Sequence, residues 1–364
     1  MTDLTRDKTL ALVLEIFGCK LEDCQVSHLG NGLINNTYLV QAPEQEFVLQ
    51  CLNQQVFTKP QQVTNNADLI SAHLQVKREN NGYPLTPVFQ LKCLNKQNHV
   101  KVAEQYWRAL QYIPQSFTLE VITSLEQAKS VAQAFAQFTS ALSDFDSKKL
   151  AEIIPNFHDL TSRISQLEQA IKSTSAPLLI SAKAEIEFIQ SQSAFIEEII
   201  KATETLPLHV THNDTKINNL LFSQITKKPI AVIDLDTCMP GYLMHDFGDM
   251  VRTCCVSIAE DSTELDNMVI DFDMLKVLTQ GYLNGFNGVL STAEQNSLLL
   301  GIKLMPFMLS IRFLTDFLTG DTYFKTHYAK HNVDRAKNQL HLYRLFCQHD
   351  ALITEIVLQD SVVI

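Results

Sequence analysis

Residues 212–236 read HNDTKINNLLFSQITKKPIAVIDLD, a polar loop that runs into two short apolar segments. The apolar segments, 219–222 and 229–235, flank the polar turn 223–228. Short apolar runs joined by a polar turn predict a β-hairpin. Long helical periodicities precede and follow it, so we expect the hairpin to be embedded in a mainly helical region.

The polar loop itself has a spacing with chemical meaning. His212, Asp214 and Asn219 match the pattern H-x-D-x-x-x-x-N of kinase catalytic loops. In such loops the Asp accepts the proton of the attacking hydroxyl, and the Asn holds a magnesium ion. Lys216 is placed to neutralise charge on the transferred phosphate. We predict catalytic roles for Asp214 and Lys216 and a metal-ligand role for Asn219.

A second metal ligand is expected at the end of the hairpin. Asp234 ends the apolar run 229–235, and Asp236 lies two positions further on. An extended backbone would point both carboxylates to the same side. Magnesium prefers oxygen ligands and bridges the nucleotide phosphates, so Asp234 is predicted as the second ligand.

Asp246-Phe247-Gly248 spells the D-F-G of protein kinases. It does not directly follow the hairpin strand, because Met239-Pro240-Gly241 intervene, and a helical pattern with Met250 and Val251 follows at once. We therefore predict that Asp246 caps that helix or braces the catalytic loop.

The remaining periodicities predict an α+β fold with two domains. Strands are predicted at 26–29, 37–41, 47–52, 86–93 and 99–113, with a helix at 61–77 and a short helix within 1–24. Helices are predicted at 124–144, 159–172, 182–203, 264–285, 292–318 and 332–348. A small antiparallel-sheet domain, residues 1–113, would thus precede a mainly helical domain, residues 114–364.

Composition restricts the class of protein. The chain of 364 residues is 46% apolar and 19% charged, which is typical of a globular protein. A net charge of −11 gives no support to nucleic-acid binding. Eight cysteines form no C-x-x-C pair, and Met1 to Thr9 lack the apolar core of a signal peptide, so a reducing cytoplasm is expected. Leu298 to Leu318 carry charges at positions 303, 312 and 316, which favours a buried helix over a membrane span.

In several short strings of residues, the chain resembles the aminoglycoside phosphotransferase and choline kinase superfamily, and more narrowly the bacterial N-acetylhexosamine 1-kinases. The similar strings are 30–37, 47–50, 106–108, 154–159, 212–219, 232–240, 246–252 and 312–316. The resemblance implies a protein-kinase-like two-lobed fold that uses ATP and Mg²⁺ to phosphorylate a small molecule, an amino sugar. It also implies that Asp214 is the catalytic base and that Asn219 and Asp234 bind magnesium.

The resemblance further implies that the turn 30–36 covers the nucleotide phosphates and that the strands at 99–113 lead to the hinge that contacts adenine. The expected nucleotide-binding residues are Asn31, Gly32, Asn35, Thr37 and Gln50. Gln50 is a departure from the protein-kinase pattern, since a lysine on the third strand normally pairs the α- and β-phosphates. Lys59 or Lys216 could compensate.

Four residues are the main candidates for binding the acceptor, and Asp159 is a further one. Trp107 and Arg108 suit either a strand core or contacts to a sugar ring and its hydroxyls. Arg312 lies in an apolar helix, where it needs a buried acidic partner unless it contacts the acceptor. Asp236 could pair with Arg252 or help to form the site. Asp159 could cap the following helix or bond the sugar.

The predicted function is therefore phosphorylation of a sugar hydroxyl, with N-acetylhexosamine 1-kinase activity as the specific expectation. One alternative is a kinase of another small alcohol, such as an aminoglycoside, choline or homoserine. A second alternative is a non-catalytic nucleotide-binding pseudokinase, for which Gln50 is the best support.

Overall fold

The computed structural model describes residues 3–30 and 34–359, so the predicted nucleotide-binding residues Asn31 and Gly32 lie outside the described residues. The chain forms two compact units that interleave along the sequence. Unit 1 comprises residues 1–119, 141–155 and 218–240, and unit 2 comprises residues 120–140, 156–217 and 241–364.

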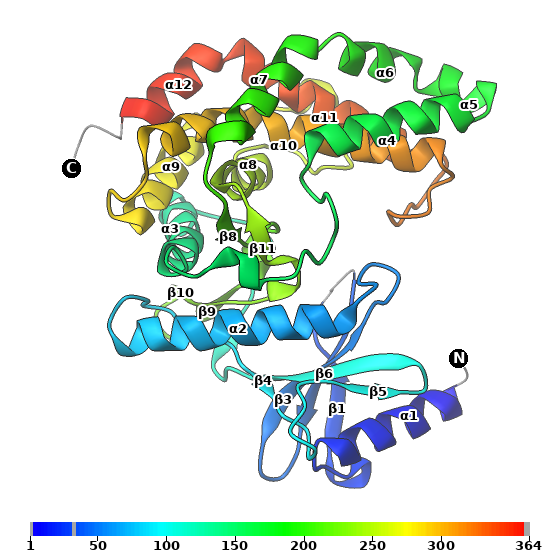
Figure 1. Ribbon diagram of the computed structural model, residues 1–364, viewed down its shortest axis with the longest axis vertical. Helices are drawn as coiled ribbons and strands as arrows, with labels where there is room; N and C mark the ends of the chain where they lie inside the picture. Colours follow the sequence, from blue (N-terminus) through cyan, green and yellow to red (C-terminus); the bar gives the residue numbers. More distant parts are fainter. Residues whose placement is uncertain (1–2, 31–33, 360–364) are drawn as a thin grey trace. The chain divides into compact units, whose positions relative to one another are not determined.

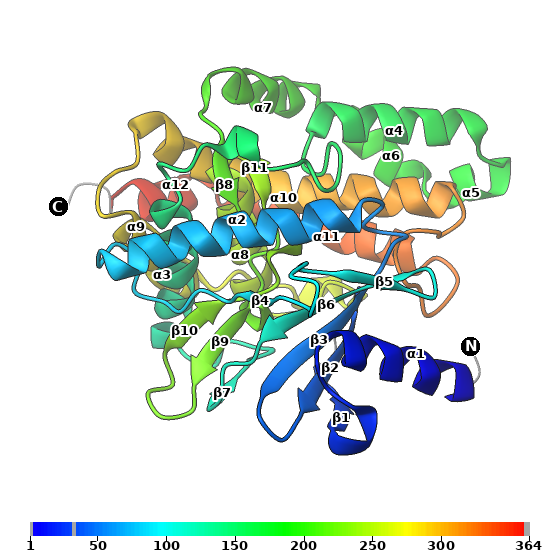
Figure 2. The same ribbon diagram turned by 60° about the horizontal axis from the view of Figure 1, so that its bottom comes forward.

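Unit 1 is built on an antiparallel sheet in which β5 pairs with β6 and the other strands have the order β1-β2-β3-β6-β4. The strands are β1 (Gln25–His28), β2 (Asn36–Gln41), β3 (Glu46–Leu52), β4 (Gln90–Leu91), β5 (Val100–Val102) and β6 (Gln105–Gln111). Figure 2 shows β1, β2 and β3 side by side. The register places Gln50 of β3 opposite Thr37 of β2 and opposite Arg108 of β6. The predicted antiparallel sheet is confirmed.

Buried residues alternate with more exposed ones along these strands, and the buried side chains form the core of unit 1. On β3, Phe47 and Leu49 are buried between more exposed neighbours, as expected for a strand with one face on the core, and Cys51 is also buried. Helix α1 (Asp3–Ile16) contacts β5 and adds Val13 and Leu14 to this core. Helix α2 (Pro60–Glu79) lies near β4 (Figure 1). It also contacts a 3₁₀ turn, η4 (Leu235–Thr237).

The predicted hairpin is present as β9 (Leu220–Ser223) and β10 (Pro229–Val232). It belongs to unit 1 and not to the mainly helical part of the chain. The reason is strand pairing: β9 also pairs with β7 (Ser116–Phe117), and Thr86 donates its backbone N–H to the carbonyl of Ile230. Two further short strands are β8 (His209–Thr211) and β11 (Met239–Gly241).

Unit 2 consists mainly of helices packed around α10. They are α3 (Leu125–Ala141), α4 (Leu160–Ser173), α5 (Ala176–Ser181), α6 (Lys183–Gln190), α7 (Ser193–Thr205), α8 (Leu243–Cys254), α9 (Phe272–Phe286), α10 (Thr292–Leu318), α11 (His331–Gln348) and α12 (Asp350–Gln359). Helix α10 contacts α4, α8, α11 and α12 (Figure 1). Sequence periodicity missed α5 and α12, and it joined α6 and α7 into one helix.

Helix α10 is long and apolar enough to cross a membrane by length and composition alone. However, 67% of its most apolar window is buried inside the structure. A capping box starts the helix, with Ser291 and Glu294 each bonding the backbone N–H of the other. The prediction of a buried core helix at this position is confirmed.

Helices α8 and α10 approach so closely that glycine is required at the contact. A Cβ atom at Gly248 would lie 2.1 Å from the carbonyl oxygen of Gly301, and one at Gly301 would lie 2.0 Å from that of Met244. Both obstacles are backbone atoms of packed helices, so neither can move without separating the helices. Gly248 is therefore required by packing, whatever the resemblance of residues 246–248 to a kinase motif.

We expect Gly248→Ala to lower the free energy of unfolding by about 3 kcal/mol or more, as overpacking in a rigid core does. The measurement is urea denaturation followed by circular dichroism. Gly82→Ala is a suitable control, because its nearest atom to an added Cβ is 3.4 Å away, and it should change stability little. Equal denaturation midpoints for the two variants would contradict this account.

Candidate active site

The loop 212–216 follows strand β8 in unit 2 and is held by Asp246 of α8. Asp246 accepts the backbone N–H of His212 at Oδ2 (2.8 Å) and that of Asn213 at Oδ1 (2.7 Å). Thr215 donates its hydroxyl to the Asp246 carbonyl (2.7 Å). Helix α8 begins at Leu243, before Asp246, so Asp246 braces the loop and does not cap the helix.

Two features of the loop itself fit a catalytic role. Asn213, directly before Asp214, has a φ of 62°, a left-handed conformation that is uncommon outside glycine and recurs at functional sites. The ammonium of Lys216 lies 3.1 Å from Oδ1 of Asp214. The Asp214 charge is the largest cause of a raised pKa for Lys216, which therefore keeps its positive charge at neutral pH. The predicted catalytic pair thus lies together.

The bracing carboxylate has an unusual titration. Burial raises the pKa of Asp246 from the ordinary 3.8 to about 7, although the two backbone N–H donors act in the opposite direction. The folded state thus holds more protons than the unfolded state between about pH 4 and pH 7. The stabilisation is complete below pH 4 and is lost as the pH rises through 7.

We expect Asp246→Asn to remove this pH dependence. Relative to the variant, the wild type should lose up to about 4 kcal/mol of unfolding free energy between pH 4 and pH 8, at ~1.4 kcal/mol per pKa unit. Urea denaturation at several pH values measures this difference. Asp266→Asn changes an exposed carboxylate, so its unfolding free energy should vary with pH in parallel with that of the wild type. Parallel curves for Asp246→Asn would contradict the assignment.

An ion-pair network lies beyond the loop in unit 2. Arg252 bonds Asp249 (2.7 Å) and Glu260 (2.6 Å), and Glu260 also pairs with Arg335 (3.1 Å). Burial alone would raise the pKa of Glu260, but Arg252 and Arg335 lower it overall. Glu260 is therefore ionised, and both Asp249 and Glu260 are already paired with arginines. The predicted pairing of Arg252 with Asp236 is wrong, since Arg252 has Asp249 and Glu260 as its partners.

Arg312 of α10 lies among aromatic rings. Its guanidinium carbon is 4.9 Å from the ring centroid of Phe157, 5.5 Å from that of Tyr323 and 5.4 Å from that of Phe324. Nη2 donates to the Tyr323 hydroxyl (3.4 Å). Within residues 3–30 and 34–359, Arg312 makes no ion pair with a carboxylate, so the expected buried acidic partner is not there. Aromatic faces instead stabilise the charge.

Asp316, one turn further along α10, organises the segment that carries two of these rings. It accepts the backbone N–H groups of Thr322 (2.9 Å), Tyr323 (2.8 Å) and Phe324 (2.9 Å). The Asn332 amide adds a further bond at 2.9 Å. A carboxylate near the end of an apolar helix is the sequence signal that could predict this arrangement.

The neighbours of Phe157 add a second guanidinium. Arg163 donates to the Phe157 carbonyl through Nη2 (3.0 Å), and burial together with the nearby Arg312 lowers the pKa of Arg163 to about 10. Burial and the charges of His245 and Arg312 lower the pKa of His158, so this imidazole is neutral at pH 7. Asp159 caps α4 through the Ser162 N–H (3.0 Å), which confirms the predicted cap.

In unit 1, five predicted site residues form one hydrogen-bonded network. Gln50 Oε1 accepts from Nε (2.9 Å) and Nη2 (2.7 Å) of Arg108, and Gln50 Nε2 donates to the Thr37 hydroxyl (3.1 Å). Arg108 Nη2 also bonds Oδ1 of Asp236 (2.5 Å). Asn35 Nδ2 donates to the other oxygen of Asp236 (2.8 Å). Arg108 and Asp236 are each only 2% exposed.

The two predicted metal ligands lie at the open end of the hairpin in unit 1. Ile233 donates its backbone N–H to the Asn219 carbonyl (2.9 Å), which holds the two sides of the hairpin together. Asp234 is exposed and left-handed (φ 59°, ψ 57°), whereas Asn219 is buried. Asn66 of α2 steadies the turn that follows by donating to the carbonyl of Cys238 (3.2 Å).

The chemistry of this pair fits magnesium. A carboxylate and an amide oxygen are hard ligands, and Mg²⁺ in nucleotide sites takes one or two protein carboxylates with phosphates and water. Within the described ranges, no cluster of three or more His, Cys, Asp or Glu side chains could hold a metal by itself. The two residues therefore suit an ion that arrives with the nucleotide.

Trp107 lies apart from this network. It is buried in the hydrophobic core of unit 1, and its ring stacks on Tyr38 with 6.3 Å between centroids. Successive strand residues face opposite sides of a sheet, so Trp107 and Arg108 serve different faces of β6. This placement favours packing for Trp107.

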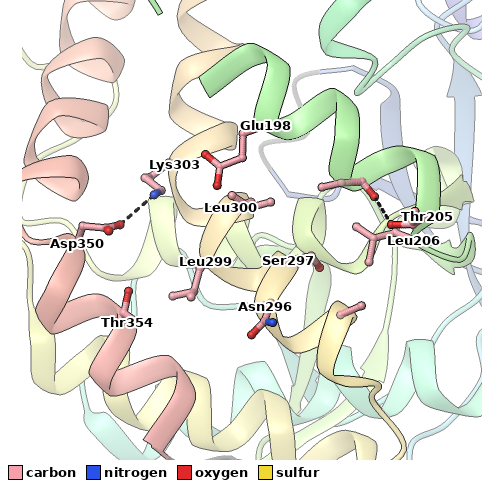
Figure 3. Close-up of a pocket in the computed structure, with 12 residues that line it drawn as sticks. Glu198, Thr205, Leu206, Asn296, Ser297, Leu299, Leu300, Lys303, Asp350 and Thr354 are labelled. Atoms are coloured by element: carbon pink, nitrogen blue, oxygen red, sulfur yellow. Dashed lines mark hydrogen bonds and ion pairs between the residues drawn. The ribbon is translucent and has the colours of Figure 1, made fainter. Parts of the chain in front are cut away.

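A separate pocket of about 420 Å³ lies among α7, α10 and α12 (Figure 3). Lys303 and Asp350 form an ion pair of 2.9 Å at its side, with Glu198 close by in the same view. The residues that line this pocket include none of the predicted site residues.

Comparison with known proteins agrees with the fold. An aminoglycoside phosphotransferase from Alicyclobacillus acidocaldarius is 13% identical, with a TM-score of 0.62 and 95% of each chain covered. A microcompartment-associated aminopropanol kinase is 16% identical (TM-score 0.58; 96% of this chain and 98% of that chain). An ethanolamine kinase from Plasmodium vivax is 13% identical (TM-score 0.54; 89% and 85%). The predicted protein-kinase-like α+β fold is thereby confirmed.

The sequence profile of the phosphotransferase enzyme family matches residues 25–272, about two thirds of the chain. The match takes in the sheet of unit 1, the loop 212–216, the hairpin and helix α8. The chain therefore belongs to the phosphotransferase enzyme family and is an ATP-dependent enzyme that transfers phosphate to a hydroxyl group.

Proposed function

We propose that this enzyme phosphorylates a hydroxyl of a neutral amino sugar, namely the anomeric hydroxyl of an N-acetylhexosamine. The observation that carries the proposal is the environment of Arg312, which is surrounded by Phe157, Tyr323 and Phe324 and lacks a carboxylate partner within the described residues. His158 lies near Arg312 and packs on His245 with 4.9 Å between ring centroids, and His245 precedes Asp246, which braces the loop that carries Asp214.

The charges around Arg312 favour a neutral acceptor over a cationic one. Arg312 and Arg163 are two neighbouring cations, His158 is neutral, and Asp249 and Glu260 are already bound to Arg252. An ammonium group on an acceptor would be repelled here, because like charges brought together outside bulk water are costly. A neutral sugar suits the site, since an aromatic face accepts the apolar face of a pyranose and guanidinium N–H groups donate to hydroxyl and acetamido oxygens.

The proposed chemistry has two parts, the transfer of the hydroxyl proton and the neutralisation of phosphate charge. Asp214 orients the acceptor hydroxyl and accepts its proton, and Lys216 offsets negative charge on the transferred group. Asn219 and Asp234 hold Mg²⁺, which when bound neutralises charge on the nucleotide phosphates. Residues 1–113 are proposed as the nucleotide-binding domain and 114–364 as the domain with the catalytic loop and acceptor site, acting in the cytoplasm.

The main rival comes from the structural neighbours, whose names identify them as kinases of aminopropanol, ethanolamine and aminoglycosides. The deciding experiment is ADP release with Mg-ATP across a panel of acceptors. N-acetylglucosamine and N-acetylgalactosamine should be the best acceptors, and the product should lose its reducing end. Turnover of ethanolamine or an aminoglycoside with no turnover of either sugar would overturn the proposal.

Arg312→Ala tests the proposed acceptor site. We expect KM for the sugar to rise about 10- to 100-fold, as loss of a charged hydrogen bond does, while KM for ATP stays within about threefold. Arg344→Ala is the matched control, because Arg344 also lies over an aromatic ring (Phe188, 3.9 Å) but on the exposed side of α11. Equal effects of the two variants, or a rise in KM for ATP only, would count against this site.

A further inference from the structure

Strand β3, the third strand of the unit 1 sheet, has no lysine, but the neighbouring strand β6 has a cation, Arg108, in the facing position. Gln50 of β3 lies directly opposite Arg108 of β6 in the sheet register. Gln50 Oε1 accepts two hydrogen bonds from Arg108, and Gln50 Nε2 is bonded to Thr37. Both the oxygen and the nitrogen of the glutamine amide are thus hydrogen-bonded to neighbouring side chains. These bonds fix the Arg108 guanidinium in one orientation.

One edge of this guanidinium has no partner. Its bonds to Gln50 and Asp236 use Nε and Nη2, and Nη1 makes no hydrogen bond within residues 3–30 and 34–359. The residue is nevertheless only 2% exposed. An arginine offers five donors in a rigid fork. Nη1 is not among the fully buried, unpaired atoms of the described residues, so its two N–H groups form the edge of the guanidinium that reaches solvent and can bind a further acceptor.

The surroundings indicate which acceptor is missing. Asp236 uses its second oxygen for Asn35, so the carboxylate is already bonded from two sides. Asn35 ends the turn expected to cover the nucleotide phosphates, and Asp234, the proposed metal ligand, lies two residues before Asp236. The guanidinium is thus tied to both segments of unit 1 that are proposed to contact phosphate. Arginine binds phosphate well because its fork matches two phosphate oxygens.

We propose that Arg108 replaces the missing third-strand lysine and binds the α- or β-phosphate of the nucleotide through Nη1. Gln50 is a positioning residue that holds Arg108 in place, and Asp236 secures the same guanidinium from the turn after Asp234. The proposal rests on nucleotide binding by unit 1 and is independent of the identity of the acceptor.

The test is calorimetric binding of ADP and of adenosine to the full-length protein without any acceptor. The main variant is Arg108→Met combined with Asp236→Asn, which avoids leaving a buried carboxylate unpaired. ADP affinity should fall about 10- to 100-fold while adenosine affinity stays within about twofold, because only ADP carries the phosphates. Addition of Gln50→Lys to this double variant should restore most of the ADP affinity, by returning a cation to β3.

Several outcomes would overturn the proposal. Equal losses for ADP and adenosine would show that Arg108 only maintains the structure, and unchanged ADP affinity would show that it does not contact phosphate. Arg108→Lys covers the case in which the double variant does not fold: it keeps the charge and should bind ADP more weakly than the wild type with adenosine unaffected. Because no sugar is present, failure of the acceptor assignment would leave these results intact.

Discussion

Asp214→Asn is expected to lower kcat by about 10²- to 10⁴-fold, the range typical of losing a general base, while the Kd for ATP changes by less than about threefold. The substitution keeps the shape of the side chain and removes its ability to accept a proton. It also removes the charge that Lys216 pairs with at 3.1 Å. Steady-state ADP release gives kcat, and calorimetry gives the Kd for ATP.

A change of Asp to Asn elsewhere in unit 2 provides the control. Asp266 is exposed, and Asp266→Asn should leave kcat unchanged. If Asp214→Asn turns over at the wild-type rate, Asp214 is not the base and the kinase-loop assignment fails. If the variant loses ATP binding as well as turnover, the residue acts on nucleotide binding or folding and not on the hydroxyl.

Asp234→Asn is expected to lower kcat by about 10²- to 10³-fold at ordinary Mg²⁺ concentration and to raise the Mg²⁺ concentration needed for half-maximal rate. The physical reason is that an amide attracts a divalent cation much less than a carboxylate does. Because the metal ion neutralises the phosphate charge, its weaker binding slows transfer. Titration of the rate with Mg²⁺ after treatment with a chelator measures both effects.

Asn219→Ala should shift the Mg²⁺ titration in the same direction, since Asn219 is the proposed partner ligand. Asn218→Ala is the matched control one position earlier, where the side chain is exposed, and it should leave the titration unchanged. An Asp234→Asn enzyme with the wild-type Mg²⁺ dependence would remove Asp234 from the metal site. Asp246, the literal D-F-G aspartate, would then need testing as the ligand.

Sequence reasoning succeeded where local patterns carry the information. Alternation placed β2 and β3 to within one residue, and the apolar periodicity of 292–318 matched α10 at both ends. Capping was one of the two roles predicted for Asp159 from its position before a helix, and the bond to Ser162 confirms the cap. Each of these depends on neighbours within a few residues along the chain.

Sequence reasoning was less successful where the structure depends on contacts between segments that are far apart in the chain. The hairpin was expected in the helical part of the chain, but pairing with β7 and Thr86 attaches it to unit 1. Arg312 was expected to need an acidic partner, and the rings of Phe157, Tyr323 and Phe324 surround it instead. No pattern within α10 predicts contacts to segments that precede or follow this helix in the sequence.

The sequence alone predicted the reacting groups: Asp214, Lys216 and Asn219 lie within six consecutive residues, and Asp234 closes the same hairpin, so their proposed order can be read from spacing. Only the tertiary structure decided what supports them. Asp246 braces the loop from a helix that starts before it, and Arg108 bonds Gln50 across a sheet and Asp236 from a segment far along the chain. These partners are 34, 58 and 128 residues apart. Such contacts depend on strand register and helix packing, which act over the whole chain and leave no local sequence pattern.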